Sequence, residues 1–195
     1  MNKVRFAFWG GEEDGLIGSD YYVSQLSARE LKDQALNLNF DMVGSPNYVR
    51  YVYDGDGSSY GAAGPDGSGF VEKVFLDYFA SQNLPAAATA FDGRSDYSGF
   101  IANGIPAGGL FTGAEALKTP EEAAVFGGTA GAPQDACYHA ACDSIGNVNT
   151  TVLEQMADAV AHATLTFAKT KSAINGTAAG KGFADLEFKG HSRLK

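Results

Sequence analysis

The sequence has no long hydrophobic run and few basic residues. No stretch approaches the roughly 20 consecutive apolar residues that a membrane-spanning helix needs. The chain has 14 Lys and Arg residues against 23 Asp and Glu residues, which gives a formal net charge of −9 over 195 residues. Nucleic acids and anionic membranes attract basic surfaces, so this charge balance argues against both as partners.

Several common catalytic motifs are also missing. The sequence has no G-x-S-x-G, no P-loop and no G-x-G-x-x-G after a predicted strand. The glycine-rich stretch "GPDGSG" at residues 64–69 is not followed by a lysine, which argues against phosphate binding there. These absences make serine hydrolases of the nucleophile-elbow type and nucleotide-binding proteins poor candidates.

Cysteine is scarce, with only Cys137 and Cys142 in "CYHAAC". Two thiols this close can form a small-loop disulfide if the backbone turns, or can stay reduced in a cytosolic protein. The even cysteine count, the few lysines and the many small polar residues favour a secreted or extracellular protein. The first 13 residues lack the features of a signal peptide, because their apolar run is short and leads into acidic residues.

Strand-like and helix-like segments alternate along the chain. The strand-like segments are 3–10, 35–45, 47–56, a short one starting at Ala86, and 105–115, whereas helical spacing covers 14–25, 28–34, 70–83 and 147–170. Residues 117–135 look loop-like. The alternation predicts an α/β fold with a mostly parallel sheet and helices on both faces. We expect one domain over residues 1–170, followed by an irregular tail or linker over 171–195.

Acidic residues follow the predicted strands. Glu12 and Glu13 come after the first strand and Asp41 after the second. Ligand sites in such sheets lie beyond the carboxyl ends of the strands, so these acids should gather at one edge. One carboxylate of an adjacent pair can bind a metal while the other acts as the base for a water beside it.

His139 is the histidine best placed to join these acids, because a closed cysteine loop would hold its ring rigidly. Zinc bound by His139 together with Cys137 and Cys142 is a weaker interpretation, since no second cysteine pair or further histidine lies nearby.

Two other charged pairs leave alternatives open. Arg94 and Asp96 either form a local salt bridge or line a substrate pocket. Glu154 and Asp158, one helical turn apart, either hold a calcium ion or belong to a solvated helix face, and the solvated face is favoured.

Four segments together resemble one family. "FWGGEEDGLIGS", "LNLNFDMVGSPN", "GRSDYSGFIANGIPAGGLFTG" and "CYHAACD" are similar, in order and spacing, to segments of the zinc aminopeptidases of the M28 family. The secreted bacterial enzymes of the Streptomyces type are the nearest in pattern, and the resemblance covers about residues 3–170. It implies a zinc-exopeptidase-like α/β/α sandwich and a two-zinc enzyme that removes N-terminal residues from peptides.

The resemblance also assigns roles by position. It implies that Glu12 is the general base, that Glu13 and His139 share one zinc, that Asp41 binds the other zinc, and that Tyr138 hydrogen-bonds the oxyanion. It further implies that Met42, Arg94 and Phe111 line the pocket for a large apolar N-terminal residue, and that Cys137 and Cys142 form the family's small-loop disulfide.

The chain departs from the family pattern at its start. The family carries a histidine and a bridging aspartate in an "H-x-D-S" loop upstream of the Glu-Glu motif, and here that motif begins at Glu12. We therefore expect a partial peptidase domain that holds one zinc or none, with impaired activity. We also expect the first strands, supplied by an N-terminal segment, to be missing from the sheet, which leaves an open edge. Two alternatives remain, a non-catalytic binding domain and a glutaminyl cyclase-like acyltransferase with one zinc. The intact acidic residues disfavour the first, and "GRSDY" with "CYHAACD" disfavours the second.

Overall fold

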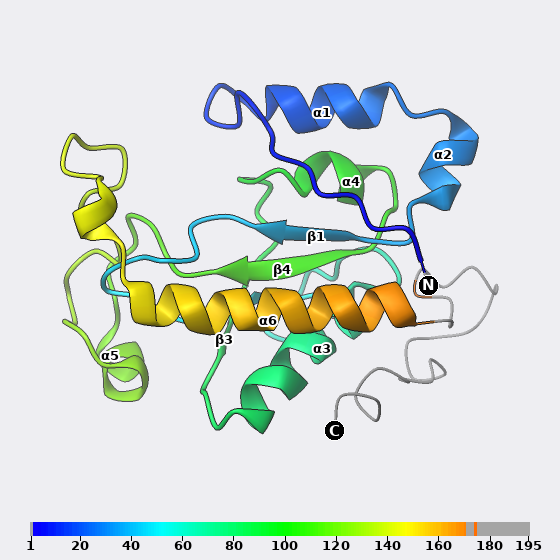
Figure 1. Cartoon of the computed structure of the whole chain (residues 1–195). Coiled ribbons are helices and arrows are strands. Elements are labelled where there is room, and N and C mark those ends of the chain that lie inside the picture. Colours follow the sequence, from blue (N-terminus) through cyan, green and yellow to red (C-terminus); the bar gives the residue numbers. More distant parts are fainter. Residues whose placement is uncertain (1, 171–173, 175–195) are drawn as a thin grey trace.

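The computed structural model describes residues 2–170 and 174 and contains a four-stranded sheet (Figure 1). The strands are β1 (Asn37–Phe40), β2 (Tyr51–Tyr53), β3 (Ala87–Thr89) and β4 (Ala107–Phe111). Their order across the sheet is β1-β4-β2-β3. The β1–β4 and β2–β3 pairs are parallel, whereas β2 and β4 are antiparallel. The sheet is therefore mixed, and the predicted α/β class is confirmed.

Helices cover both faces of the sheet, as the alternating pattern predicted (Figure 1). They are α1 (Ile17–Ser24), α2 (Ala28–Asp33), α3 (Ser68–Ser81), α4 (Ser98–Ala102), α5 (Pro120–Phe126), the 3-10 helix η1 (Ile145–Asn147) and α6 (Thr150–Lys169). Helices α3 and α6 pack on one face, and α1 and α4 lie over the other. The predicted tail, residues 171–195, lies outside the described residues apart from Ile174.

The main core lies between the sheet and the α3–α6 pair. In α3, Phe70, Val74, Phe75 and Phe79 recur at helical spacing and are all nearly fully buried. The ring of Phe75 meets Phe40 of β1 edge to face, with the centroids 6.1 Å apart. This packing joins the longest helices to the edge strand of the sheet.

Helix α6 begins at a side-chain cap. The Asn149 side chain accepts hydrogen bonds from the backbone N–H groups of Thr151 and Val152. Two donors that the first helical turn leaves unpaired are thereby satisfied. Among the described residues, no helix combines the length and the hydropathy needed to cross a membrane.

The prediction of a buried strand over residues 3–10 is wrong. The segment forms no strand, and the Phe6 and Phe8 side chains are 76% and 96% exposed. It is instead held at its ends, where Asn2 N–H donates to the Ala168 carbonyl of α6 and Trp9 packs on Tyr22 of α1. Apolar alternation does not make a strand without a neighbouring strand to share hydrogen bonds, and within residues 2–170 the edge strand β1 pairs with β4 alone.

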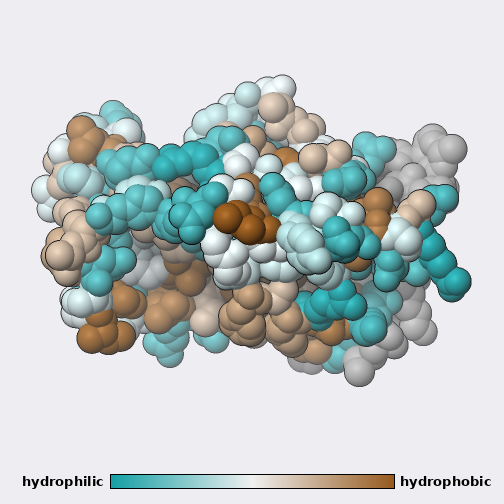
Figure 2. Space-filling model, turned by 90° about the horizontal axis from the view of Figure 1, so that it is seen from above, coloured by the Kyte–Doolittle hydropathy of each residue, from teal (hydrophilic) through white to brown (hydrophobic). Residues whose placement is uncertain are grey.

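The face that carries α1 and the N-terminal segment shows this exposure at the molecular surface. In Figure 2, which views that side, hydrophobic residues reach the surface near the middle and along the lower border among hydrophilic ones. Ile17 of α1 is 57% exposed and adds to the exposed phenylalanines of the N-terminal segment. The open sheet edge and the exposed apolar surface that the sequence predicted are both present.

The loop-like assignment of residues 117–135 is wrong in part, because the segment contains α5. Thr119 caps this helix by accepting from Glu122 N–H, the Glu122 carboxylate accepts from Thr119 N–H, and Pro120 occupies the first turn. This arrangement is a capping box with proline at the start of the helix. The "TPEE" stretch carried that signal, but the helix is only seven residues long and its apolar spacing is weak.

Candidate metal centre and active site

A cavity of about 430 Å³ opens where β1 and β4 end. Seven of the residues singled out in the sequence line it, from five separate segments. They are Glu12, Glu13, Asp41, Met42, Arg94, Phe111 and Tyr138. β1 ends at Phe40 and β4 at Phe111, and because these strands are parallel, their carboxyl ends reach the same edge. The sheet topology therefore explains why residues far apart in the sequence meet.

A tight turn presents the Glu12–Glu13 pair. The Glu12 carbonyl accepts from the N–H groups of Gly15 and Leu16, and Gly18 N–H donates to the Gly10 carbonyl. A Cβ at Gly18 would lie 2.6 Å from the Gly10 oxygen, so the crossing requires glycine there. The chain then enters α1 directly, which fixes the turn against a regular helix.

Glu13 and His139 meet directly, although 126 residues separate them. His139 Nε2 lies 2.7 Å from Glu13 Oε1, and the two side chains are 55% and 66% exposed. The Tyr138 ring stacks on the His139 imidazole at 3.8 Å between centroids. The positive φ of His139, 53°, turns the backbone within the loop that carries both rings.

A disulfide closes that loop. Cys137 and Cys142 are bonded, with their Cα atoms 5.3 Å apart. Just before it, Asp135 Oδ1 accepts from Cys137 N–H and from the Asn147 side-chain amide, each at 2.9 Å. The imidazole is thus carried by a loop anchored at its base and crosslinked across it.

Two buried polar side chains in series orient Asp41: Ser95 contacts Asp41, and Asn39 contacts Ser95. Ser95 Oγ donates to Asp41 Oδ2 at 2.7 Å and accepts from Asn39 Nδ2 at 2.9 Å. Both Asn39 and Ser95 are less than 10% exposed. Neither residue was predicted as part of the site, because their positions, one on a strand and one in "GRSDY", were the only signals in the sequence. Met42 follows in the left-handed conformation, with φ at 50° and its carbonyl bound by Thr112 N–H at 2.8 Å.

Arg94 pairs with Glu115, which the sequence analysis did not single out. Its Nη1 lies 2.9 Å from Glu115 Oε1, and both side chains are more than half exposed. The prediction of a local Arg94–Asp96 salt bridge is therefore wrong. Arg94 instead lines the cavity, as the alternative predicted. Asp96 is buried instead, and burial is the main reason its pKa is raised.

Negative charge shapes the electrostatics of the cavity. The pKa of Glu12 is raised, first by burial and then by repulsion from Asp41, Glu13 and Asp96. Burial also raises the pKa of Tyr138, with the Glu13 charge adding to it. Carboxylates gathered this closely favour a cation among them.

The donors at the cavity match the chemistry of zinc, which takes imidazole nitrogen and carboxylate oxygen. Two such donors on one tetrahedral zinc lie ~3.3 Å apart, so Glu13 and His139 would separate slightly, which their exposure permits. No third His, Cys, Asp or Glu among the described residues joins this pair within the reach of one ion. Asp41 stands apart on its own, so the described residues offer two donors to one ion and a single donor to another.

A mixed α/β structure with an acidic pair, a histidine and a third acid at the sheet edge has the donor types of a protein metal site. The chain matches the model of peptidase family M28 over residues 1–164, and it belongs to this family. It is 53% identical over 173 residues to the "probable leucine aminopeptidase 2" of Aspergillus oryzae. It is 52% identical over 164 residues to an aminopeptidase of Pseudomonas aeruginosa.

Solved structures agree with the sequence matches. A zinc aminopeptidase from Bacillus subtilis superposes with a TM-score of 0.63 at 28% identity, covering 86% of this chain and 36% of that one. The matches to the two curated relatives cover 89% and 84% of this chain, but only 35% and 31% of the relatives' own lengths. This chain thus spans about a third of the relatives that it matches.

Proposed function

We propose that this chain carries part of the active centre of a zinc-dependent aminopeptidase that acts on peptides with a free N-terminus. The observation that carries the proposal is the direct contact between Glu13 and His139, beside Glu12 and Tyr138 at one cavity. The family membership and the aminopeptidases among its relatives support it.

Glu13 and His139 would hold one zinc ion, and Asp41, oriented by Ser95, would contribute to a second. Bound zinc supplies Lewis acidity toward a peptide carbonyl and a water molecule. Since the described residues give too few donors to close either coordination sphere, we propose that a further segment of the protein supplies the others. The strand edge at β1, paired on one side only, offers that segment a place to join the sheet.

Glu12 is the candidate base. It lines the cavity next to Glu13 without pairing with His139, so its carboxylate is available to accept the proton of the attacking water. The same carboxyl group would return the proton to the leaving amine. Tyr138 lines the cavity beside Glu13, where its hydroxyl would donate to the oxyanion.

The remaining lining favours an apolar first residue on the substrate. Phe111 stacks on Tyr51 with the ring centroids 5.9 Å apart, and Met42 lies on the same side of the sheet edge. A leucine side chain suits such a lining, in keeping with the relatives named leucine aminopeptidase. The carboxylates around the cavity would attract the α-ammonium group, which favours exopeptidase over endopeptidase action.

We also propose that the protein works outside the cytoplasm. The crosslinked Cys137–Cys142 loop carries the proposed ligand His139, and such a bond persists in oxidising compartments.

The test combines zinc content with hydrolysis of leucine p-nitroanilide. The chain is dialysed against micromolar zinc, and bound metal is counted by mass spectrometry for the wild type, Glu13→Gln and His139→Ala. We expect both variants to lose zinc that the wild type retains, whereas Glu121→Gln, an exposed acid on α5, retains it. Adding the preceding segment of the protein should raise both zinc content and hydrolysis. Unchanged zinc in both variants, or ammonia release from glutaminyl peptides without hydrolysis, would overturn the proposal.

A further inference from the structure

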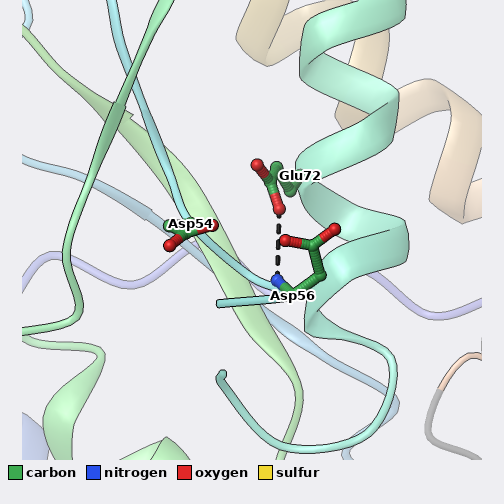
Figure 3. A group of neighbouring side chains, drawn as sticks. All are labelled: Asp54, Asp56 and Glu72. Atoms are coloured by element: carbon green, nitrogen blue, oxygen red, sulfur yellow. Dashed lines mark hydrogen bonds between the residues drawn. The ribbon is translucent and has the colours of Figure 1, made fainter. Parts of the chain in front are cut away.

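A second group of acids lies outside the proposed active centre. Asp54 directly follows β2, Asp56 lies two residues further along the loop, and Glu72 belongs to the first half of α3 (Figure 3). One oxygen from each of the three carboxylates lies within 4.8 Å of those of the other two. None of the three lines the cavity at the β1 and β4 ends.

Strand alternation separates the two sites. Val52 packs beneath α3 in the main core, whereas Tyr53 points to the opposite face and lines the cavity. Asp54 therefore returns to the α3 face, where Glu72 lies (Figure 3). The acidic cluster therefore lies on the α3 side after β2, whereas the proposed zinc ligands lie around the cavity beyond the carboxyl ends of β1 and β4.

Two glycines bring the loop and the helix together closely enough for the carboxylates to converge. A Cβ at Gly55 would lie 2.2 Å from the Ser68 carbonyl oxygen, and a Cβ at Gly69 would lie 2.8 Å from the Asp56 Cβ. The backbone after β2 thus rests directly on the first turn of α3.

Hydrogen bonds within the loop use only part of the carboxylates' capacity. Asp54 Oδ2 accepts from the N–H groups of Ser59 and Tyr60, and Glu72 Oε2 accepts from those of Gly55 and Asp56. Asp54 Oδ1, however, is buried and accepts no hydrogen bond from any described residue, although the whole residue is only 1% exposed. A buried carboxylate oxygen without a donor is costly, so this oxygen calls for a cation.

Among the described residues, no basic side chain forms an ion pair with these acids. The four ion pairs among residues 2–170 join other residues, and none includes Asp54, Asp56 or Glu72. Asp56 is exposed whereas the other two acids are buried, so the cluster has an opening to solvent on the Asp56 side. A small ion can enter there.

We propose that Asp54, Asp56 and Glu72 bind a calcium ion, at a site separate from the proposed aminopeptidase centre. Calcium binds oxygen at 2.3–2.6 Å, so two ligand atoms on one ion lie up to roughly 5 Å apart, a span that contains every pair here. Magnesium dehydrates reluctantly and is seldom held by a cage of protein oxygens alone, and zinc favours nitrogen or sulfur donors, which this cluster lacks. The bound ion fastens the loop after β2 to α3 and completes the coordination of Asp54 Oδ1.

The sequence had suggested calcium elsewhere, at Glu154 and Asp158. Both residues are exposed on α6, and among the described residues no third acid joins them. The structure therefore favours the solvated face for that pair and places the converging acids at β2 and α3.

The experiment is a calorimetric calcium titration of the whole chain, freed of metal with a chelator, followed by thermal melts with and without the ion. We expect one calcium per chain with a Kd below about 1 mM and a higher Tm in calcium than in chelator. Glu72→Gln and Asp56→Asn should each weaken binding at least tenfold. Asp77→Asn, an acid on the same helix whose partner is Lys73, should leave it within twofold.

Each other result contradicts the assignment. If folded wild-type protein shows neither heat of binding nor a shift in Tm at calcium concentrations up to 10 mM, the proposed site is wrong. Binding retained in both Glu72→Gln and Asp56→Asn would place the ion elsewhere, and tighter binding of magnesium than of calcium would overturn the identity of the ion. Because Asp56 is exposed, its variant remains folded and informative even if the buried Glu72 variant does not.

Discussion

The two acidic sites lie in different parts of the fold, one beyond the carboxyl ends of β1 and β4 and the other between the end of β2 and α3, and they differ in how the chain builds them. At the cavity, Glu13 and His139 come from segments 126 residues apart and both side chains are more than half exposed. In the acidic cluster, Asp54, Asp56 and Glu72 come from a span of 19 residues, and two of the three are buried. The first site mixes nitrogen and oxygen donors, and the second contains oxygen alone.

This difference separates two uses of a metal site. Exposed donors beside an open cavity leave coordination positions for substrate and water, which a catalytic ion requires. Buried donors fixed by backbone N–H groups close around an ion and connect elements of the fold, which is what a structural ion does. If the comparison holds, substitutions at one site should leave the other unaffected, because the two sites share no residue.

The largest expected effect falls on catalysis. Glu12→Gln in the form of the protein that hydrolyses leucine p-nitroanilide should lower kcat by roughly 10² to 10⁴-fold, because the base is lost while the ligands Glu13 and His139 remain. Zinc content and calcium binding should both be unchanged. Steady-state kinetics with metal analysis check this, with Glu121→Gln as the exposed control. A kcat within threefold of wild type would remove Glu12 from the mechanism.

The second-largest effect is expected at the acidic cluster, which is the more buried of the two sites. Gly55→Ala places a methyl group against the Ser68 carbonyl, so the loop must move away from α3. We expect the free energy of unfolding to fall by about 1–3 kcal/mol, as in other overpacked sites. Calcium affinity should fall with it and zinc binding should not. Gly146→Ala, where the nearest atom lies 3.7 Å away, serves as the control in urea unfolding. Equal stability of the two variants would contradict the close approach.

The sequence predicted the cavity residues but not the acidic cluster, and the reason is physical. Asp41 follows β1 and Phe111 ends the parallel strand β4, so position along the chain sufficed for these two. Glu12 and Glu13 reach the same cavity through the turn before α1, not from the strand expected over residues 3–10. Asp54 precedes Gly55, and an Asp-Gly pair usually marks a turn. The convergence of Asp54 with Glu72 depends on how closely the loop approaches α3, which no local pattern encodes.

Prediction of the fold from the sequence was also only partly successful. Long periodic segments such as α3 and α6 were predicted because burial of one face determines them. The strand expected over residues 3–10 failed because a strand depends on a neighbour, and β1 pairs only with β4. Helix α5 was missed because its stability rests on the Thr119 cap and Pro120 rather than on an apolar stripe.

Ser95 tests the support beneath the cavity. Ser95→Ala removes the hydroxyl that donates to Asp41 and leaves Asn39 Nδ2 without its buried acceptor. A hydrogen bond to a charged group contributes about 1.5 kcal/mol or more, so unfolding should become easier by about that amount. The second-metal affinity should fall and the calcium titration should not change. Ser95→Thr, which keeps the hydroxyl, should recover metal binding, and failure of that rescue would assign Ser95 to packing alone.

The smallest effect is expected at Arg94, although its ion pair with Glu115 is short. Both side chains are more than half exposed, so water and salt screen the attraction, and such pairs contribute between 0 and about 1 kcal/mol. Arg94→Ala should therefore change the free energy of unfolding by less than about 1 kcal/mol, and a double-mutant cycle with Glu115→Gln should show equally weak coupling.

If Arg94 instead serves the substrate, Arg94→Ala should raise KM for leucyl substrates while kcat changes little, because the lost contact is made before the chemical step. A large loss of stability with unchanged KM would reverse this assignment and make the cavity rim, like the acidic cluster, a structural feature.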